Sequence, residues 1–217
     1  MTAAPKAAEP PIAAADETAA VLLLLAAGAS CRYGGIKQLA DFAGEALVHR
    51  TARIALASGA RVLVITGANA GLVTAALADL PLAAVEHPAW REGMGSSIAA
   101  GIGQLQARYP QASGALLCLA DQPLYEGIWL AELLAAHRRS PGSIIATQNG
   151  GMPGPPVLFP RDLFAELARW SGPKGPQALL QREAHRVIQV VSPAGVDVDT
   201  PDDLQRALEI LASARPD

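Results

Sequence analysis

Short apolar runs alternate with amphipathic segments along the first two thirds of the chain. The runs, which are typical of buried strands, occupy residues 21–26, 61–66, 82–85, 115–119 and 143–147. The segments with helical spacing occupy residues 46–58, 70–78, 96–108 and 128–138. Strands that alternate with helices predict an α/β fold: a Rossmann-like, doubly wound, mostly parallel sheet with helices on both faces.

The order of elements changes after residue 147. A Gly- and Pro-rich stretch at residues 149–156 leads to a short predicted strand at 157–159. Two short helices and a strand near residues 186–191 follow. Thr200 and Pro201 predict the start of the last helix, because Thr is a favoured N-cap and Pro suits the first helical position.

No linker along the chain separates two domains, so we expect one domain over residues 21–214. Residues 1–20 are rich in Ala, Pro and acidic side chains, and this composition predicts a disordered leader.

The composition narrows the class of protein. Hydrophobic residues make up 51% of the 217 residues, which is enough for a large core, and the net charge of -3 gives no sign of a basic surface for nucleic acid. The longest apolar run is too short to span a bilayer, and acidic residues near the N-terminus argue against a signal peptide. The two cysteines lack CxxC spacing. We therefore expect a cytoplasmic protein that binds neither nucleic acid nor membrane.

The loop after the first strand has the residues of an anion-binding site. Residues 25–37 read LAAGASCRYGGIK, which is neither a Walker A loop nor a GxGxxG turn. Ligands of such sheets bind at the carboxyl ends of the strands, where small residues let backbone N–H groups approach phosphates. Arg32 offers a bidentate donor for phosphate oxygens, and Lys37 can stabilise charge at an α-phosphate.

Carboxylates follow the predicted strand at residues 115–119 and precede the predicted last helix. Asp121 comes directly after the strand at residues 115–119 and suits Mg²⁺, which prefers carboxylate and phosphate oxygens. Asp197 and Asp199 are the candidates for a second ligand, because alternate residues of an extended segment point the same way. The alternatives are structural: Asp121 capping a turn before Pro123, and Asp199 interacting with the dipole of the last helix.

Two serines stand at the start of the helix at residues 96–108. The hydroxyl groups of Ser96 and Ser97 can exchange hydrogen bonds with a base or ribose, although ordinary N-capping explains one of them equally well.

The loop sequence LAAGxSxR followed by Lys37 resembles the signature of nucleotidyltransferases with a Rossmann-like, glycosyltransferase-A type fold. The version with GGIKQL is most similar to the molybdenum-cofactor nucleotidyltransferases, the MobA-like NTP transferases, and among them to the cytidylyltransferases. The guanylyltransferases more often have Asp before the Lys, where this chain has Ile36. The resemblance covers about residues 21–210.

The resemblance implies roles for particular residues. It implies nucleotide binding by the residues Ala26, Ala27, Gly28, Ser30, Arg32, Lys37, Ser96 and Ser97. It implies catalysis by Arg32, Lys37 and Asp121, and a Mg²⁺ ion held by Asp121 and Asp199.

The acceptor side is implied by two further segments. Residues 151–159 are similar to the family's Gly-x-Pro-x-x-Phe stretch, with an inserted Gly-Pro, and residues 171–175 are similar to its Gly-Asp-Lys-Gly segment. These segments make Gly151, Pro153 and Lys174 the acceptor-binding candidates.

The implied reaction is transfer of CMP from CTP to the phosphate of molybdenum cofactor (molybdopterin), with release of pyrophosphate. A molybdenum hydroxylase or its maturation factor is the implied protein partner. Three alternatives stay open: the same reaction with GTP, cytidylyl transfer to a sugar or polyol phosphate, and a nucleotide- or cofactor-binding carrier without turnover.

Overall fold

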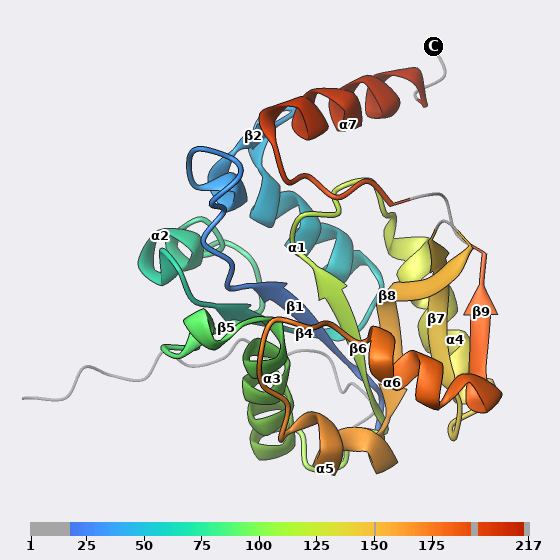
Figure 1. Ribbon diagram of the computed structural model, residues 1–217. Helices are drawn as coiled ribbons and strands as arrows, with labels where there is room; N and C mark the ends of the chain where they lie inside the picture. The colour runs from blue at the N-terminus through green and yellow to red at the C-terminus, as the bar shows by residue number, and fades with distance from the viewer. Residues whose placement is uncertain (1–17, 150, 192–194, 215–217) are drawn as a thin grey trace, which may run out of the picture.

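The structure, a computed structural model, describes residues 18–149, 151–191 and 195–214. Seven strands within these residues form one sheet in the order β5-β4-β1-β6-β8-β7-β9 (Figure 1). The strands are β1 (Val21–Ala26), β4 (Arg61–Thr66), β5 (Ala83–Glu86), β6 (Gly114–Leu119), β7 (Ile144–Asn149), β8 (Met152–Pro160) and β9 (Val187–Val190). Most of the predicted leader, residues 1–17, lies outside the described residues.

The sheet is mostly parallel, as the sequence predicts. β1 pairs in parallel with β4 and β6, β4 with β5, and β7 with β9, whereas β8 runs antiparallel to both of its neighbours. Apart from the intermediate Leu25, the residues of β1 are buried, which is why the strand is an unbroken apolar run rather than an alternating one.

Helices cover both faces of the sheet (Figure 1). Leu22 and Leu24 of β1 belong to a core cluster with residues of α1 (Leu47–Ala57), α2 (Ala70–Ala75) and α4 (Gly127–Arg139). Val21 and Leu23 belong to a second cluster with residues of α3 (Met94–Arg108), α5 (Phe164–Leu167) and α6 (Gln177–Arg182). The predicted doubly wound α/β fold is confirmed.

The Gly- and Pro-rich stretch at residues 149–156 forms more strand than its composition predicts. β7 and β8 form an antiparallel hairpin whose pairing extends from Asn149 and Met152, and its register shifts between Ala146 and Thr147. The prolines lack N–H groups, so the ladder is interrupted there. The Thr147 hydroxyl lies 3.0 Å from the carbonyl oxygen of Gly154, which it can donate to in place of a backbone group.

The last helix, α7 (Pro201–Ser213), lies beyond the carboxyl ends of the central strands (Figure 1). It begins with the predicted Thr200 cap, extended by Asp203 into a capping box. Ala207 of α7 packs with Phe42 of a small hairpin, β2 (Asp41–Phe42) and β3 (Glu45–Ala46), that the sequence pattern did not predict. Short 3₁₀ helices complete the described elements: η1 (Lys37–Leu39), η2 (Trp90–Glu92), η3 (Arg161–Leu163) and η4 (Ala184–Arg186).

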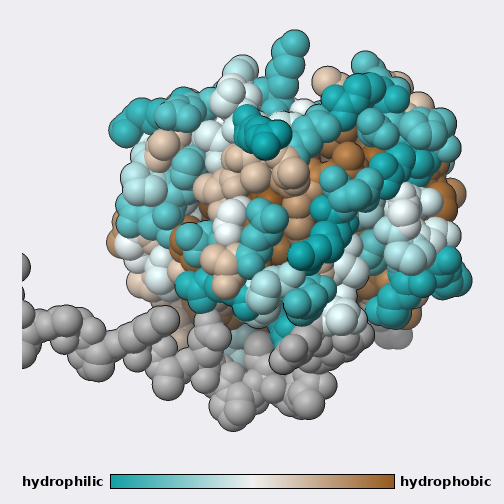
Figure 2. All heavy atoms as spheres, turned by 90° about the horizontal axis from the view of Figure 1, so that it is seen from below, coloured by the Kyte–Doolittle hydropathy of each residue, from teal (hydrophilic) through white to brown (hydrophobic). Residues whose placement is uncertain are grey.

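None of the described helices is long and apolar enough to cross a bilayer. Figure 2 shows the underside of the molecule, where hydrophilic side chains surround smaller hydrophobic areas.

Candidate active site

A pocket of about 360 Å³ opens at the carboxyl ends of β1 and β6. Four parts of the chain form it: the loop after β1, the segment that leads into α3, the residues that follow β6, and the segment before α7. Its lining residues are Leu25, Ala26, Ala27, Gly28, Ala29, Ser30, Cys31, Arg32, Lys37, Gln38, Trp90, Arg91, Gly93, Met94, Ser97, Leu119, Ala120, Asp121 and Asp199.

The loop after β1 is held in shape by Gln38. The side chain of Gln38 is only 3% exposed, and its amide nitrogen donates to the carbonyl oxygen of Gly28 at 2.7 Å. Its amide oxygen accepts a hydrogen bond of 2.9 Å from the hydroxyl of Ser30, a residue with a positive φ of 58°. Gln38 thus supplies hydrogen-bond partners to a loop that has no regular structure of its own.

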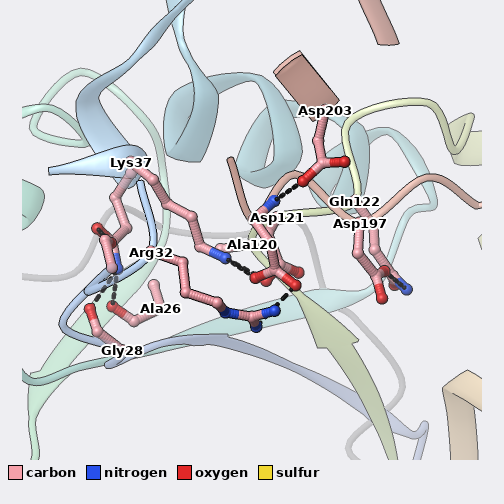
Figure 3. A network of polar contacts seen from close by, with 12 residues as sticks. Ala26, Gly28, Arg32, Lys37, Ala120, Asp121, Gln122, Asp197 and Asp203 are labelled. Carbon is pink, nitrogen blue, oxygen red and sulfur yellow. Dashed lines mark hydrogen bonds and ion pairs between the residues drawn. The ribbon is translucent and has the colours of Figure 1, made fainter. Parts of the chain in front are cut away.

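The two cations and two carboxylates of the pocket contact one another (Figure 3). The Lys37 ammonium group lies 2.8 Å from Oδ2 of Asp121 and 2.9 Å from Oδ1 of Asp199. Arg32 reaches Oδ2 of Asp199 at 2.8 Å, although its side chain is 73% exposed. Residues that are 84 and 162 positions away from Lys37 therefore meet at its amino group.

The pKa values of Asp121 and Lys37 are both raised, for different reasons. Burial raises the pKa of Asp121, and the attraction of Lys37 only partly offsets it. Burial alone would lower the pKa of Lys37, but its contacts with Asp121 and Asp199 together raise it. Lys37 is therefore a cation at neutral pH.

The backbone fixes where the two carboxylates lie. The N–H of Val198 donates to the carbonyl oxygen of Asp121 at 2.8 Å, so the segment before α7 is tied to the end of β6. The carboxylate of Asp203 accepts from the N–H groups of Asp199 and Thr200 at 3.1 and 2.7 Å. The start of α7 thus holds Asp199 at the pocket.

The chemistry of the pocket suits a divalent cation. Oδ1 of Asp121 is buried and has no hydrogen-bond partner in the described part of the chain, which is unusual for a carboxylate oxygen. With Asp199 beside it, the donor set is of the oxygen type that Mg²⁺ and Mn²⁺ bind. No group of three or more His, Cys, Asp or Glu side chains among the described residues is arranged to hold a metal ion, so any such ion would also need oxygens from its substrate or from water.

A second pocket, of about 330 Å³, adjoins the first. Met94 and Leu119 line both. The further residues that line the second pocket are Gln122, Met152, Pro153, Gly154, Pro155, Gly175, Pro176, Gln177 and Asp197. Asp121 and Gln122 are consecutive in the chain, and each lines a different pocket.

The structure brings most of the predicted site residues together but separates some of them. All of the predicted nucleotide-binding residues line the first pocket except Ser96, whose hydroxyl lies 2.8 Å from the carbonyl oxygen of Gly93 and 3.0 Å from Nε2 of His87. Ser97 lines the pocket. The two predicted carboxylates of the last segment also part: Asp199 lines the first pocket and Asp197 the second.

The three predicted acceptor residues are spread in the same way. Pro153 lines the second pocket. Gly151 lies in the turn between β7 and β8 with a φ of 86°, and the exposed Lys174 precedes Gly175; neither Gly151 nor Lys174 lines a pocket described here.

Some site residues escaped the sequence reasoning. Gln38 directly follows Lys37, and this position beside the loop motif is the one sequence signal that could have identified it. Trp90 and Arg91 line the first pocket, where the Arg91 guanidinium group stacks over the Trp90 ring at 4.4 Å. They precede Gly93, the N-cap of α3, but nothing in their spacing marks them as pocket residues.

A loop with two cations that faces paired carboxylates at the carboxyl edge of an α/β sheet is the arrangement expected of a nucleotidyltransferase. The chain belongs to the family of the MobA-like NTP transferase domain, whose sequence profile matches residues 22–187. It is therefore an enzyme that transfers nucleotidyl groups, and its family implies a nucleoside triphosphate as substrate. No curated protein matches the chain.

Solved structures show the same fold. Rv0371c from Mycobacterium tuberculosis H37Rv is 30% identical with a TM-score of 0.75, and the match covers 89% of this chain and 100% of that one. A further structure of Rv0371c, also 30% identical, is a complex with manganese (TM-score 0.72, 88% and 99% covered). A homologue of this protein thus binds a divalent metal.

Two more distant structures support the glycosyltransferase-A type fold alone. A nucleotidyl transferase from Methanothermobacter is 18% identical, with a TM-score of 0.76 and 91% and 99% covered. A CMP:2-keto-3-deoxy-manno-octonic acid synthetase complexed with CTP is 17% identical, with a TM-score of 0.68 and 91% and 100% covered.

Proposed function

We propose that this protein transfers CMP from CTP to the phosphate of molybdenum cofactor, with release of pyrophosphate. The observation that carries the proposal is the Lys37–Asp121–Asp199 cluster at the first pocket, beside a second pocket large enough for another ligand. A donor in one pocket and an acceptor in the other would meet near Asp121, which gives the proximity that such transfers require.

The proposed reaction is an in-line displacement. An oxygen of the acceptor phosphate forms a bond to the α-phosphorus of CTP, and the bond from this phosphorus to the oxygen of the β-phosphate breaks, so that pyrophosphate leaves. Lys37 would stabilise charge at the α-phosphate and Arg32 would hold the leaving pyrophosphate. Asp121 and Asp199 would hold Mg²⁺, which neutralises phosphate charge when bound.

The reaction needs no general base. A phosphate monoester is already an anion at neutral pH, so the acceptor oxygen requires positioning rather than deprotonation. This agrees with the first pocket, which no histidine among the described residues lines.

The choice of CTP and of molybdenum cofactor rests on sequence similarity. Ile36 precedes Lys37 where the guanylyltransferase relatives more often have Asp, which favours cytidylyl over guanylyl transfer. By the same similarity, a molybdenum hydroxylase or its maturation factor would receive the product. Transfer to a sugar or polyol phosphate is the rival with the same chemistry.

The test is pyrophosphate release with Mg²⁺ and purified molybdenum cofactor, with CTP, GTP, ATP and UTP offered separately. A sugar phosphate and a polyol phosphate are offered in parallel as acceptors. We expect release with CTP and a loss of at least about a hundredfold in Asp121→Ala. Asp202→Ala is the matched control, because Asp202 is an exposed carboxylate near the site that lines neither pocket.

The other outcomes separate the rivals. A preference for GTP would keep the mechanism and replace the donor. Release only with a sugar or polyol phosphate would replace the acceptor. Nucleotide binding without release from any of these acceptors would indicate a carrier and contradict the proposal.

A further inference from the structure

The second pocket has walls that suit a flat ring. Met152, Pro153 and Pro155 line it, together with the Met94 and Leu119 side chains that it shares with the first pocket. Apolar walls of this kind favour contact with the faces of a planar heterocycle over contact with a hydrated polyol chain.

Charge distinguishes the second pocket from the first. Among the described residues that line it, Asp197 is the one charged side chain. In the first pocket the three cations Arg32, Lys37 and Arg91 outnumber the two carboxylates of Asp121 and Asp199. A carboxylate disfavours phosphate and favours N–H donors. The phosphate of an acceptor should therefore lie at the cationic side, and its uncharged, donor-bearing part should enter the second pocket.

Asp197 is held in place by a buried amide. Nε2 of Gln122 donates to Oδ1 of Asp197 at 2.8 Å, in a contact that lies apart from the Lys37 cluster (Figure 3). Gln122 is only 6% exposed, whereas Asp197 is exposed. No described residue donates to Oδ2 of Asp197, and Oε1 of Gln122 is buried without a partner in the described part of the chain. Oδ2 of Asp197 therefore remains an unused acceptor at the second pocket.

We infer that Asp197 recognises the amino-pyrimidinone edge of a pterin, by accepting hydrogen bonds from its ring N–H and its adjacent amino group. Two oxygens of one carboxylate match two parallel N–H donors, and an oxygen that already accepts one hydrogen bond can accept a second. Gln122 is a positioning residue that keeps the carboxylate oriented. The inference rests on the proposed function, in which the acceptor is a pterin phosphate.

The test measures the binding of two phosphate-free probes through the change in their fluorescence. The first is 6-hydroxymethylpterin, and the second is 6-hydroxymethyllumazine, in which a carbonyl oxygen replaces the 2-amino group. The wild-type protein should bind the pterin at least about tenfold more tightly, because the lumazine carbonyl would face a carboxylate. Asp197→Asn should weaken pterin binding about ten- to hundredfold and remove the preference. Asp202→Asn is the matched control and should behave as wild type.

Further measurements separate recognition from folding and from metal binding. Gln122→Leu keeps the volume of the side chain and should weaken pterin binding less than Asp197→Asn does, and thermal melting checks that both variants fold. Asp197→Asn should raise KM for the molybdenum cofactor while kcat and KM for CTP stay unchanged. Its affinity for Mn²⁺ should also equal that of wild type.

Several results would overturn the inference. One is that wild type binds the two probes equally or does not bind the pterin. Another is that Asp197→Asn still binds the pterin as wild type does. A third is that Asp197→Asn loses affinity for Mn²⁺, which would make Asp197 a metal ligand. Failure of the proposed function looks different: no pyrophosphate release from molybdenum cofactor with any nucleotide, while pterin binding still depends on Asp197.

Discussion

The Gln38 side chain makes the hydrogen bonds to the loop after β1 that backbone groups would make in a regular helix or strand. It bonds to the Gly28 carbonyl oxygen and the Ser30 hydroxyl, so the loop that lines the first pocket depends on one buried amide. A buried amide with several partners is costly to replace, because each lost bond leaves a polar group unsatisfied. Gln38 therefore controls the shape of the loop without needing to contact the nucleotide.

Gln38→Leu should weaken CTP binding about tenfold and lower the free energy of unfolding by about 1–3 kcal/mol, because Gly28 and Ser30 lose their partners. Calorimetric titration with CTP and urea unfolding measure the two effects. Gln181→Leu, at an exposed position of α6, is the matched control and should change neither. Normal CTP affinity in Gln38→Leu would show that the loop keeps its shape by other contacts.

At the scale of elements, polar contacts join the start of α1 to the segment after α2. The ring nitrogens of His49 lie 3.1 Å from Glu45 and 3.1 Å from Asp79. Hydrogen bonds to Asp79 and Glu45 raise the pKa of His49. The pKa of Glu45 is lowered to about 2, chiefly by the hydrogen bond from Arg53, so Glu45 stays ionised over the whole physiological range.

A pH dependence of stability follows from His49. Because its folded-state pKa is raised, its contribution is complete below the unfolded pKa of about 6.5 and is lost as pH rises through the folded pKa. Urea midpoints at pH 6 and pH 8.5 should therefore show a larger decrease for wild type than for His49→Gln, by a small margin because solvent screens these groups. His185→Gln is the control. Identical decreases in wild type and His49→Gln would contradict the assignment.

At the scale of the whole molecule, the site joins segments from both ends of the chain, so ligands should stabilise the entire fold. CTP with Mn²⁺ at about 100 times its Kd adds roughly 2.7 kcal/mol, which corresponds to a rise in Tm of roughly 5–10 °C for a chain of this size. Differential scanning fluorimetry measures the rise, and EDTA should remove its metal-dependent part. Persistence of that part in Asp121→Ala would exclude Asp121 as a metal ligand.

Local patterns along the chain were enough for the class of fold and for the residue types of the site. The apolar run of β1 predicts its strand, because a strand buried on both faces is apolar at every position. Thr200 predicts the start of α7, because an N-cap stands directly before the helix that it caps. The cations after β1 and the carboxylate after β6 were located for the same reason: ligand-binding residues of such sheets follow strands.

Only the tertiary structure decided which of these residues meet. The reversal of β8 and its pairing with β7 depend on contacts that Pro- and Gly-rich composition obscures. The approach of Lys37 to Asp199, 162 positions away, depends on the order of the strands and on the tie between Val198 and Asp121. The division of Asp197 and Asp199 between two pockets has the same origin, because periodicity predicts the direction of a side chain only within its own segment and says nothing of what lies opposite it.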